Sequence, residues 1–301
     1  MRREWRVAES LELRASEPSA TRSRLTRASL KASRLLNTAA ATLAAGVLTD
    51  SAAEHYRAGF HNRAMFIAPA VSAAALTTAA ATAFTPAGHR VLSRAVFAVS
   101  VATGVVGFGF HVTNVSRRIG GWNPENVFHG APIAAPLAIT MAGLLGLAAS
   151  RIARSAASGD DRLPQRTGSR LAGALGSLSA LGLAGTSIEA GALHFRGAFQ
   201  NPFMFAPVII PPTAAATLAT AAVSRSPRVR NAAGGLLRLT AWLGVAGVCF
   251  HAWGVQRRMG GWSNWRQNVL AGPPLPAPPA FTGLALAGLA ALELLEAERT
   301  E

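Results

Sequence analysis

The chain has 301 residues and a formal net charge of +15, and half of its residues are hydrophobic. A chain of this length could form two soluble domains, but its apolar residues occur in runs of about twenty, which is longer than the buried stripe of a soluble helix. Most of the 29 basic residues lie in the segments between these runs, which is typical of membrane topology and argues against nucleic-acid binding.

Eight runs of mostly uncharged residues follow one another along the chain. Each has the length that an α-helix needs to cross about 30 Å of hydrocarbon, and each is built mainly from Ala, Leu, Gly, Val and Thr, which allow close helix packing. The runs cover residues 36–56, 64–84, 92–115, 131–150, 171–195, 203–223, 233–255 and 272–293. The sequence therefore predicts an all-α integral membrane protein with eight transmembrane helices.

The basic residues predict how these helices are oriented. Twenty-one of the 29 lie in segments that share one side of the membrane if the first helix runs outward, namely residues 1–34, 90–94, 151–170, 225–238 and 299. Positive charge accumulates on the cytoplasmic side, so we expect a protein of the inner (plasma) membrane with both termini in the cytoplasm. Residues 1–34 are expected to form a loosely ordered cytoplasmic arm, 151–170 a linker and 296–301 a tail.

Two pairs of similar stretches indicate an internal repeat. The stretch FHVTNVSRRIGGW (110–122) shares eight of thirteen residues with FHAWGVQRRMGGW (250–262), and HYRAGFHNRAMF (55–66) shares six of twelve with HFRGAFQNPFMF (194–205). The order of the helices is the same in both halves, which predicts two tandem, parallel four-helix bundles over residues 35–150 and 171–295. The Gly-Gly pairs are expected to end their helices, with the Trp that follows at the membrane interface.

Ionisable residues inside the apolar runs cost a few kcal/mol each at the bilayer centre, and here they recur in both halves. The corresponding pairs are Asp50 and Glu189, His55 and His194, Arg57 and Arg196, His111 and His251, and Arg118 and Arg258. Counting from the start of each run places all four histidines near the outer surface. A spacing of seven residues places Asp50 with Arg57, and His111 with Arg118, on a common helix face. We therefore expect one polar outer layer in each half.

These residue types favour an electron-transfer subunit of a larger complex. Two imidazoles at similar height on separate helices can ligate haem b, and Gly107 and Gly247, one turn before a histidine, would leave room for the macrocycle. Arginines can bind haem propionates or a quinone carbonyl. The predicted binding residues for haem b or quinone are His55, His111, His194, His251, Arg57, Arg118, Arg196 and Arg258, with Asp50 and Glu189 as a proton relay or as ion-pair partners.

Two other functions are compatible with the same residues. A transporter or channel for a small anionic solute would use the arginines, although the polar groups occupy only one side of the predicted spans. A non-catalytic membrane anchor would use the charged residues as internal salt bridges, with lipid phosphates bound by Arg117, Arg118, Arg257 and Arg258 and an interfacial belt formed by Trp122, Trp262 and Trp265. The expected partners are the lipid bilayer and a protein on the periplasmic or extracellular side, with no nucleic acid.

Overall fold

The computed structural model describes residues 2–85, 90–158, 167–224 and 226–297, and their regular structure is entirely helical. The helices in chain order are α1 (Arg2–Arg57), η1 (Arg63–Phe66), α2 (Ile67–Phe84), α3 (Arg90–Ser116), α4 (Pro124–His129), α5 (Pro136–Ser158), α6 (Thr167–Arg196), η2 (Pro202–Phe205), α7 (Ala206–Val223), α8 (Pro227–Gln256), η3 (Gly261–Asn264), α9 (Trp265–Leu270) and α10 (Pro279–Ala297). The prediction of an all-α chain is confirmed for these residues.

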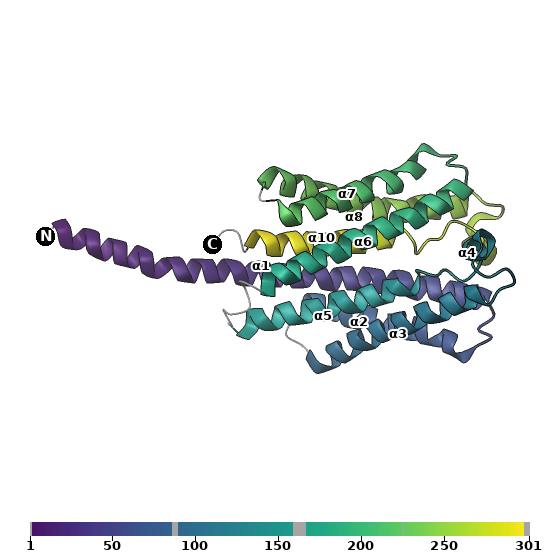
Figure 1. Cartoon of the computed structure of the whole chain (residues 1–301), viewed down its shortest axis with the longest axis horizontal. Helices are drawn as coiled ribbons and strands as arrows, with labels where there is room; N and C mark the ends of the chain where they lie inside the picture. Colours follow the sequence, from purple (N-terminus) through teal and green to yellow (C-terminus); the bar gives the residue numbers. More distant parts are fainter. Residues whose placement is uncertain (1, 86–89, 159–166, 225, 298–301) are drawn as a thin grey trace.

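The long helices form two groups of four (Figure 1). In the first ring, α1 and α3 each pack against α2 and α5; in the second ring, α6 and α8 each pack against α7 and α10. The short helices gather at one end of the molecule, which we call the loop end, and both chain termini lie toward the other end, the terminus end (Figure 1). Helices α1, α3, α6 and α8 all finish at the loop end, so their last turns lie near one another.

Seven of the described helices are long and apolar enough to cross a membrane. They cover Arg63–Phe84, Val91–Ser116, Pro136–Ala157, Arg170–Arg196, Pro202–Val223, Pro227–Gln256 and Pro279–Ala297. The eighth predicted run, in α1, falls short because it contains Asn37, Asp50 and Glu54. Helix α1 packs against α2, α5 and α10, so much of its surface contacts protein and does not need to be strongly apolar.

Helices α5 and α10 begin five and seven residues later than the sequence predicts, at Pro136 and Pro279 rather than at 131 and 272. The segments before them are rich in proline. Proline has no N–H for a helix interior and disfavours the helical conformation in the residue before it, whereas it is well tolerated in the first turn. The proline clusters therefore remain as turns, and each of these helices starts on a proline.

Helix α1 is continuous from Arg2 to Arg57 and extends well beyond the rings at its N-terminal end (Figure 1). It includes residues 2–34, for which the sequence favours a loosely ordered arm. Arg, Leu, Ala and Glu are frequent in that segment and have high helix propensity, which accounts for the difference. The predicted linker 151–170 and tail 296–301 lie partly outside the described residues.

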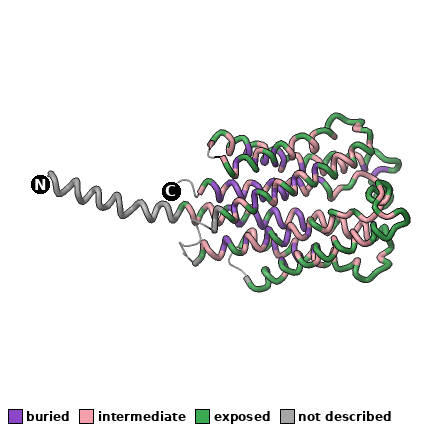
Figure 2. The backbone as a smooth tube through the Cα atoms, viewed as in Figure 1, coloured by how far each residue is buried: buried purple, intermediate pink, exposed green. Residues whose placement is uncertain are grey.

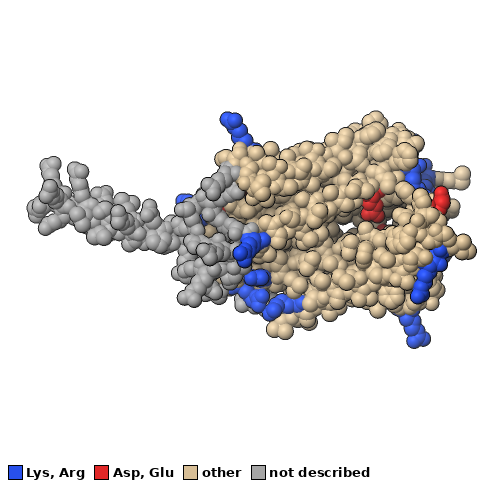
Figure 3. Space-filling model, viewed as in Figure 1, with Lys and Arg blue, Asp and Glu red and all other residues tan. Residues whose placement is uncertain are grey.

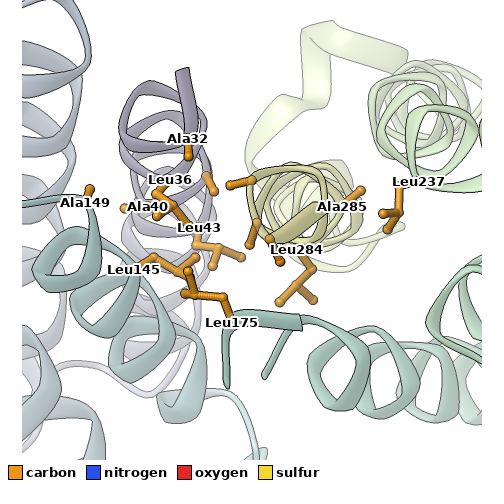
Figure 4. Packing of buried hydrophobic residues seen from close by; sticks show 14 of the residues in the cluster. Ala32, Leu36, Ala40, Leu43, Leu145, Ala149, Leu175, Leu237, Leu284 and Ala285 are labelled. Carbon is orange, nitrogen blue, oxygen red and sulfur yellow. The ribbon is translucent and has the colours of Figure 1, made fainter. Parts of the chain in front are cut away.

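The core follows the contact between α1 and α10, and burial is concentrated toward the middle and the terminus end, while the loop end is largely exposed (Figure 2). Leu36 and Leu43 of α1, Leu284 of α10, Leu145 and Leu175 all belong to this buried cluster (Figure 4). A Cβ at Gly283 would lie 2.8 Å from Leu43 Cγ, so this glycine permits the close approach. Helices α5 and α6 make no comparable contact, so the two rings are joined mainly along α1 and α10.

Candidate functional site

The ten predicted site residues all lie at the loop end. Helix α1 carries Asp50, His55 and Arg57 in its last two turns, and α6 carries Glu189, His194 and Arg196 in the same place; His111 and His251 lie near the ends of α3 and α8, and Arg118 and Arg258 follow directly after these helices. Because the four helices end together, the fold brings the ten residues to one end of the molecule, as the sequence predicts. The hydrogen bonds and ion pairs of these residues differ from those that the sequence predicts.

Each of the four histidines is held by a backbone carbonyl through its Nδ1 atom. The Nδ1–O distances are 2.5 Å from His55 to Met65, 2.8 Å from His194 to Met204, 2.6 Å from His111 to Pro132 and 2.7 Å from His251 to Pro274. A carbonyl oxygen can only accept a hydrogen bond, so Nδ1 carries the proton and donates it. In the neutral ring, Nε2 then keeps its lone pair, ready to ligate a metal or accept a hydrogen bond.

A tight turn after α1 positions His55. Gly59 and Phe60 have φ of 73° and 43°, which reverses the chain so that the Phe60 ring stacks on Phe66 with centroids 4.2 Å apart. The same Phe60 ring lies edge-on to the imidazole of His55, 6.1 Å away. The turn after α6 has the same contacts, with 6.1 Å between His194 and Phe199 and 4.5 Å between Phe199 and Phe205.

The Gly-Gly pairs end their helices, as predicted: Gly120, Gly121, Gly260 and Gly261 all have positive φ, between 50° and 86°. An asparagine side chain then fixes each turn. Asn126 Nδ2 donates to the carbonyls of Ile119 (3.0 Å) and Gly121 (2.8 Å), and Asn268 Nδ2 donates to those of Met259 (3.1 Å) and Gly261 (2.8 Å). Neither asparagine is apparent from the repeat in the sequence, because Asn126 follows Gly121 by five residues and Asn268 follows Gly261 by seven.

Gly107 and Gly247 do not leave room for a macrocycle, so that expectation is wrong. A Cβ at Gly107 would lie 3.1 Å from Pro136 Cβ, and one at Gly247 would lie 2.7 Å from Pro278 Cβ. The space beside each glycine is already occupied by a proline at the start of the neighbouring helix. These glycines therefore serve the packing of α3 on α5 and of α8 on α10.

The predicted pairing of Asp50 with Arg57 is also not found. Arg57 Nη1 lies 3.0 Å from Glu54 Oε1, one turn away, whereas Asp50 lies two turns, or about 10.5 Å of helix rise, from Arg57. In the part of the chain that the structure describes, neither Asp50 nor Glu189 has an ion pair or hydrogen bond.

Asp50 and Glu189 nevertheless lie near enough for their charges to interact, although they belong to different rings. Asp50 is half-buried and Glu189 is exposed. Figure 3 shows acidic side chains at a hollow between the two rings toward the loop end. Neither carboxylate has a basic group within ion-pair distance among the described residues, although Arg57 is near enough to Asp50 for their charges to interact.

The arginines do not converge on one point. Arg57 donates to the carbonyl of Leu270 at the end of α9 and so links the two rings, and Arg118 Nη1 donates to the carbonyl of His129 at 3.3 Å. Arg196 and Arg258 are exposed. In the second ring, His194 and His251 lie near enough for their charges to interact. Among the described residues, no group of three or more His, Cys, Asp or Glu could hold a metal ion by itself.

The chain was compared with protein-family models, curated proteins and solved structures. No protein-family model, curated protein or solved structure matches the chain. Functional inference therefore depends on the arrangement of the side chains.

Proposed function

We propose that the chain is a multi-pass membrane protein with eight spans, in which α1 is the eighth span beside the seven apolar helices. The central position of α1 supports its inclusion, since protein covers its polar positions on several sides. We further propose that the two rings are tandem parallel repeats. The matched turns support this, because the bond from His55 to Met65 has its counterpart between His194 and Met204. The distribution of basic residues favours a loop end on the outer side and cytoplasmic termini.

We propose that each ring binds a haem b at the loop end, ligated by His55 with His111 in one ring and by His194 with His251 in the other. One observation carries this proposal: all four imidazoles are fixed through Nδ1 by a backbone carbonyl, which leaves Nε2 unprotonated. Metal-ligating histidines are oriented in this way, with the other ring nitrogen donating to a carbonyl or carboxylate. The bound haem would supply one-electron transfer, as expected of an electron-transfer subunit in a larger complex.

The tautomer favours haem over quinone. A quinone carbonyl is bound by hydrogen-bond donors, and the neutral imidazole with its proton on Nδ1 offers only a lone pair at Nε2. The exposed guanidinium groups of Arg118 and Arg258 follow the haem-ligand histidines by seven residues and would pair with propionates. The carboxylates of Asp50 and Glu189, which form no ion pair among the described residues, would exchange protons during the redox cycle.

The two alternative functions have less support from the geometry. A solute path would need polar groups along its length, but buried Ala and Leu of α1 and α10 fill the contact between the rings below the polar layer. A purely structural anchor accounts for the histidine–carbonyl bonds but assigns no role to four free Nε2 atoms. An experiment that removes Nε2 while keeping a donor for the carbonyl separates the anchor from the haem proposal.

Asparagine substitutions make this separation. The side-chain amide in His194→Asn or His251→Asn can still donate to the backbone carbonyl, but it has no imidazole nitrogen to ligate iron. We expect the purified protein to show the reduced-minus-oxidised spectrum of a six-coordinate b-type haem, and each variant to lose about half of its haem while it elutes as the folded protein in gel filtration.

The matched control is His61→Asn. The His61 ring is held in the same way, because its Nδ1 lies 3.0 Å from the carbonyl oxygen of Ala58. His61 is not one of the four proposed haem ligands. We expect full haem content in this variant. A wild-type protein that remains free of haem when it is expressed with added haemin would contradict the proposal.

A further inference from the structure

Two surface turns at the loop end present an apolar side chain beside a pair of arginines. We call residues 117–122 and 257–262 the two tips; they read Arg-Arg-Ile-Gly-Gly-Trp and Arg-Arg-Met-Gly-Gly-Trp. The central residues are almost completely solvent-exposed, Ile119 by 100% and Met259 by 92%. All four arginines are exposed as well. An Ile or Met that remained in water would forgo about 1.5–3 kcal/mol of burial free energy, so its presentation at both tips needs an explanation.

The tips are not loose loops. The amides of Asn126 and Asn268 each hold two carbonyls of a tip at 2.8–3.1 Å, and one of each pair is the carbonyl of the exposed Ile119 or Met259. The left-handed glycines that follow then turn the chain away. The exposed side chains are therefore held in place by ordered backbone, which lowers the entropy cost of binding a partner there.

Their position along the helix axis indicates the partner. The apolar helix Val91–Ser116 has 26 residues, which corresponds to about 39 Å of rise, whereas the hydrocarbon layer is about 30 Å thick. The excess places the residues directly after the helix several ångströms above the hydrocarbon, at the level of the lipid phosphates. Trp122 and Trp262, which are about half exposed, are the residue type that favours this interface.

The charge at the tips points to an anionic partner. Each tip carries two arginines, and no described carboxylate forms an ion pair with any of them. Arg118 donates one hydrogen bond, from Nη1, to the carbonyl of His129, and its other N–H groups remain available to a ligand. Guanidinium groups match phosphate oxygens in geometry and bind them with charge-assisted hydrogen bonds.

We propose that each tip binds the phosphate of an anionic phospholipid in the outer leaflet. The Arg pair holds the headgroup, while Ile119 or Met259 and the neighbouring Trp contact the glycerol backbone and the uppermost carbons of the acyl chains. This inference rests on the membrane orientation proposed above. It shares Arg118 and Arg258 with the haem proposal, whereas Arg117 and Arg257 belong to the tips alone. It assigns a partner to basic residues that otherwise oppose the preference for positive charge on the cytoplasmic side.

The test uses the full-length protein and phosphatidylglycerol as the probe, with bound lipid counted by native mass spectrometry against a phosphatidylcholine background. The wild-type protein should retain two phosphatidylglycerol molecules. The variant Arg117→Gln/Arg257→Gln removes one arginine from each tip and should bind phosphatidylglycerol about tenfold more weakly, the effect of losing one charge-assisted bond. The variant Ile119→Ser/Met259→Ser should also weaken binding, because it removes the acyl-chain contact.

The control is Arg63→Gln/Arg266→Gln, which makes the same change in net charge with two exposed arginines of the loop end outside the tips. It should bind lipid like the wild-type protein. Equal weakening in the control would show a general charge effect and overturn the proposal. Unchanged lipid binding in the Arg117/Arg257 variant would overturn it as well. So would a finding that the tips bind an acidic protein in preference to phosphatidylglycerol. A haem spectrum of each sample separates the two proposals, because Arg117 and Arg257 are not assigned to haem.

Discussion

Ala198 adopts a backbone conformation that alanine rarely tolerates. Its φ is 53°, and the corresponding residue in the first ring is Gly59, with φ of 73°. A residue with a Cβ in the left-handed region costs about 1–2 kcal/mol, a cost that glycine avoids. The turn keeps this conformation because the next residue, Phe199, stacks on Phe205 and lies edge-on to His194. The contacts of Phe199 therefore hold Ala198 in this strained conformation, and the resulting turn keeps the Phe199 ring beside His194.

Exchanging the residue types between the two rings tests this cost. We expect Ala198→Gly to raise the free energy of unfolding by up to about 1 kcal/mol, and Gly59→Ala to lower it by about 1–2 kcal/mol. No atom lies within 4 Å of a Cβ built at Gly59, so the second effect comes from the backbone alone. Thermal unfolding in detergent measures both changes. An unchanged unfolding temperature for Gly59→Ala would mean that the left-handed turn is not kept in solution.

At the residue scale, the sequence predicts that the candidate site residues lie together at one end of the molecule, but it does not predict their hydrogen-bond partners. The paired histidines and the Gly-Gly ends were visible because they recur at nearly constant offsets. The hydrogen-bond acceptors were not visible, since the carbonyls of Pro132 and Pro274 lie 21 and 23 residues after their histidines, across proline-rich turns. Such a contact depends on the path of the backbone, which no side-chain pattern encodes.

The contact between α8 and α10 shows how closely paired elements approach one another. A Cβ at Gly244 would lie 2.3 Å from Thr282 Oγ1 and 2.7 Å from the carbonyl of Pro278, distances that require the helices to separate. Thr282 Oγ1 also donates to the carbonyl of Ala241 at 2.8 Å, so the two helices share a hydrogen bond at this point. Small residues that permit this type of contact are a common basis of helix packing in membranes.

Alanine scanning of two glycines in α8 tests this contact. We expect Gly244→Ala to lower the free energy of unfolding by about 1–3 kcal/mol or more through overpacking against α10. Gly235→Ala in the same helix has open space around its Cβ, so it should be neutral or stabilise by up to about 1 kcal/mol through helix propensity. Unfolding temperatures of the two variants provide the comparison. A similar decrease in both would argue that α8 is not packed on α10 in this register.

At the scale of elements, seven of the eight predicted runs became helices that are apolar enough to span a membrane. Composition predicts such runs well, because a membrane helix must be apolar wherever it faces lipid. Two starting points were wrong where prolines interrupt an apolar run, and α1 was less apolar than expected because protein surrounds it. Which helices neighbour one another was not apparent, since small residues line several faces of each helix.

The two ends of the whole molecule carry different sets of basic residues. The described basic residues of the terminus end include Arg94, Arg151 and Arg228, and those of the loop end include the arginines of the candidate site and of the tips. If the protein spans the membrane as proposed, a probe that cannot cross the bilayer will reach only one of these ends.

Cysteine labelling tests this orientation. Cys249 is exposed, so Cys249→Ala first removes the native thiol. In that background, Glu125→Cys at the loop end, where the glutamate side chain is 85% exposed, should react with an impermeant maleimide in intact cells. Arg151→Cys at the terminus end should react only after permeabilisation. The reverse pattern would invert the proposed orientation, and equal labelling of both before permeabilisation would contradict a membrane-spanning arrangement.

The close packing of α1 on α10 also determines when the molecule can be completed. More than 200 residues separate Leu43 from its neighbour Gly283, so the contact between the rings cannot form until α10 has been synthesised. Until then, α1 has an uncovered strip of Ala and Leu. Contacts of such long sequence separation form slowly and leave intermediates that are open to misassembly. A nascent chain that stalls before α10 should therefore be a preferred target of membrane chaperones and proteases.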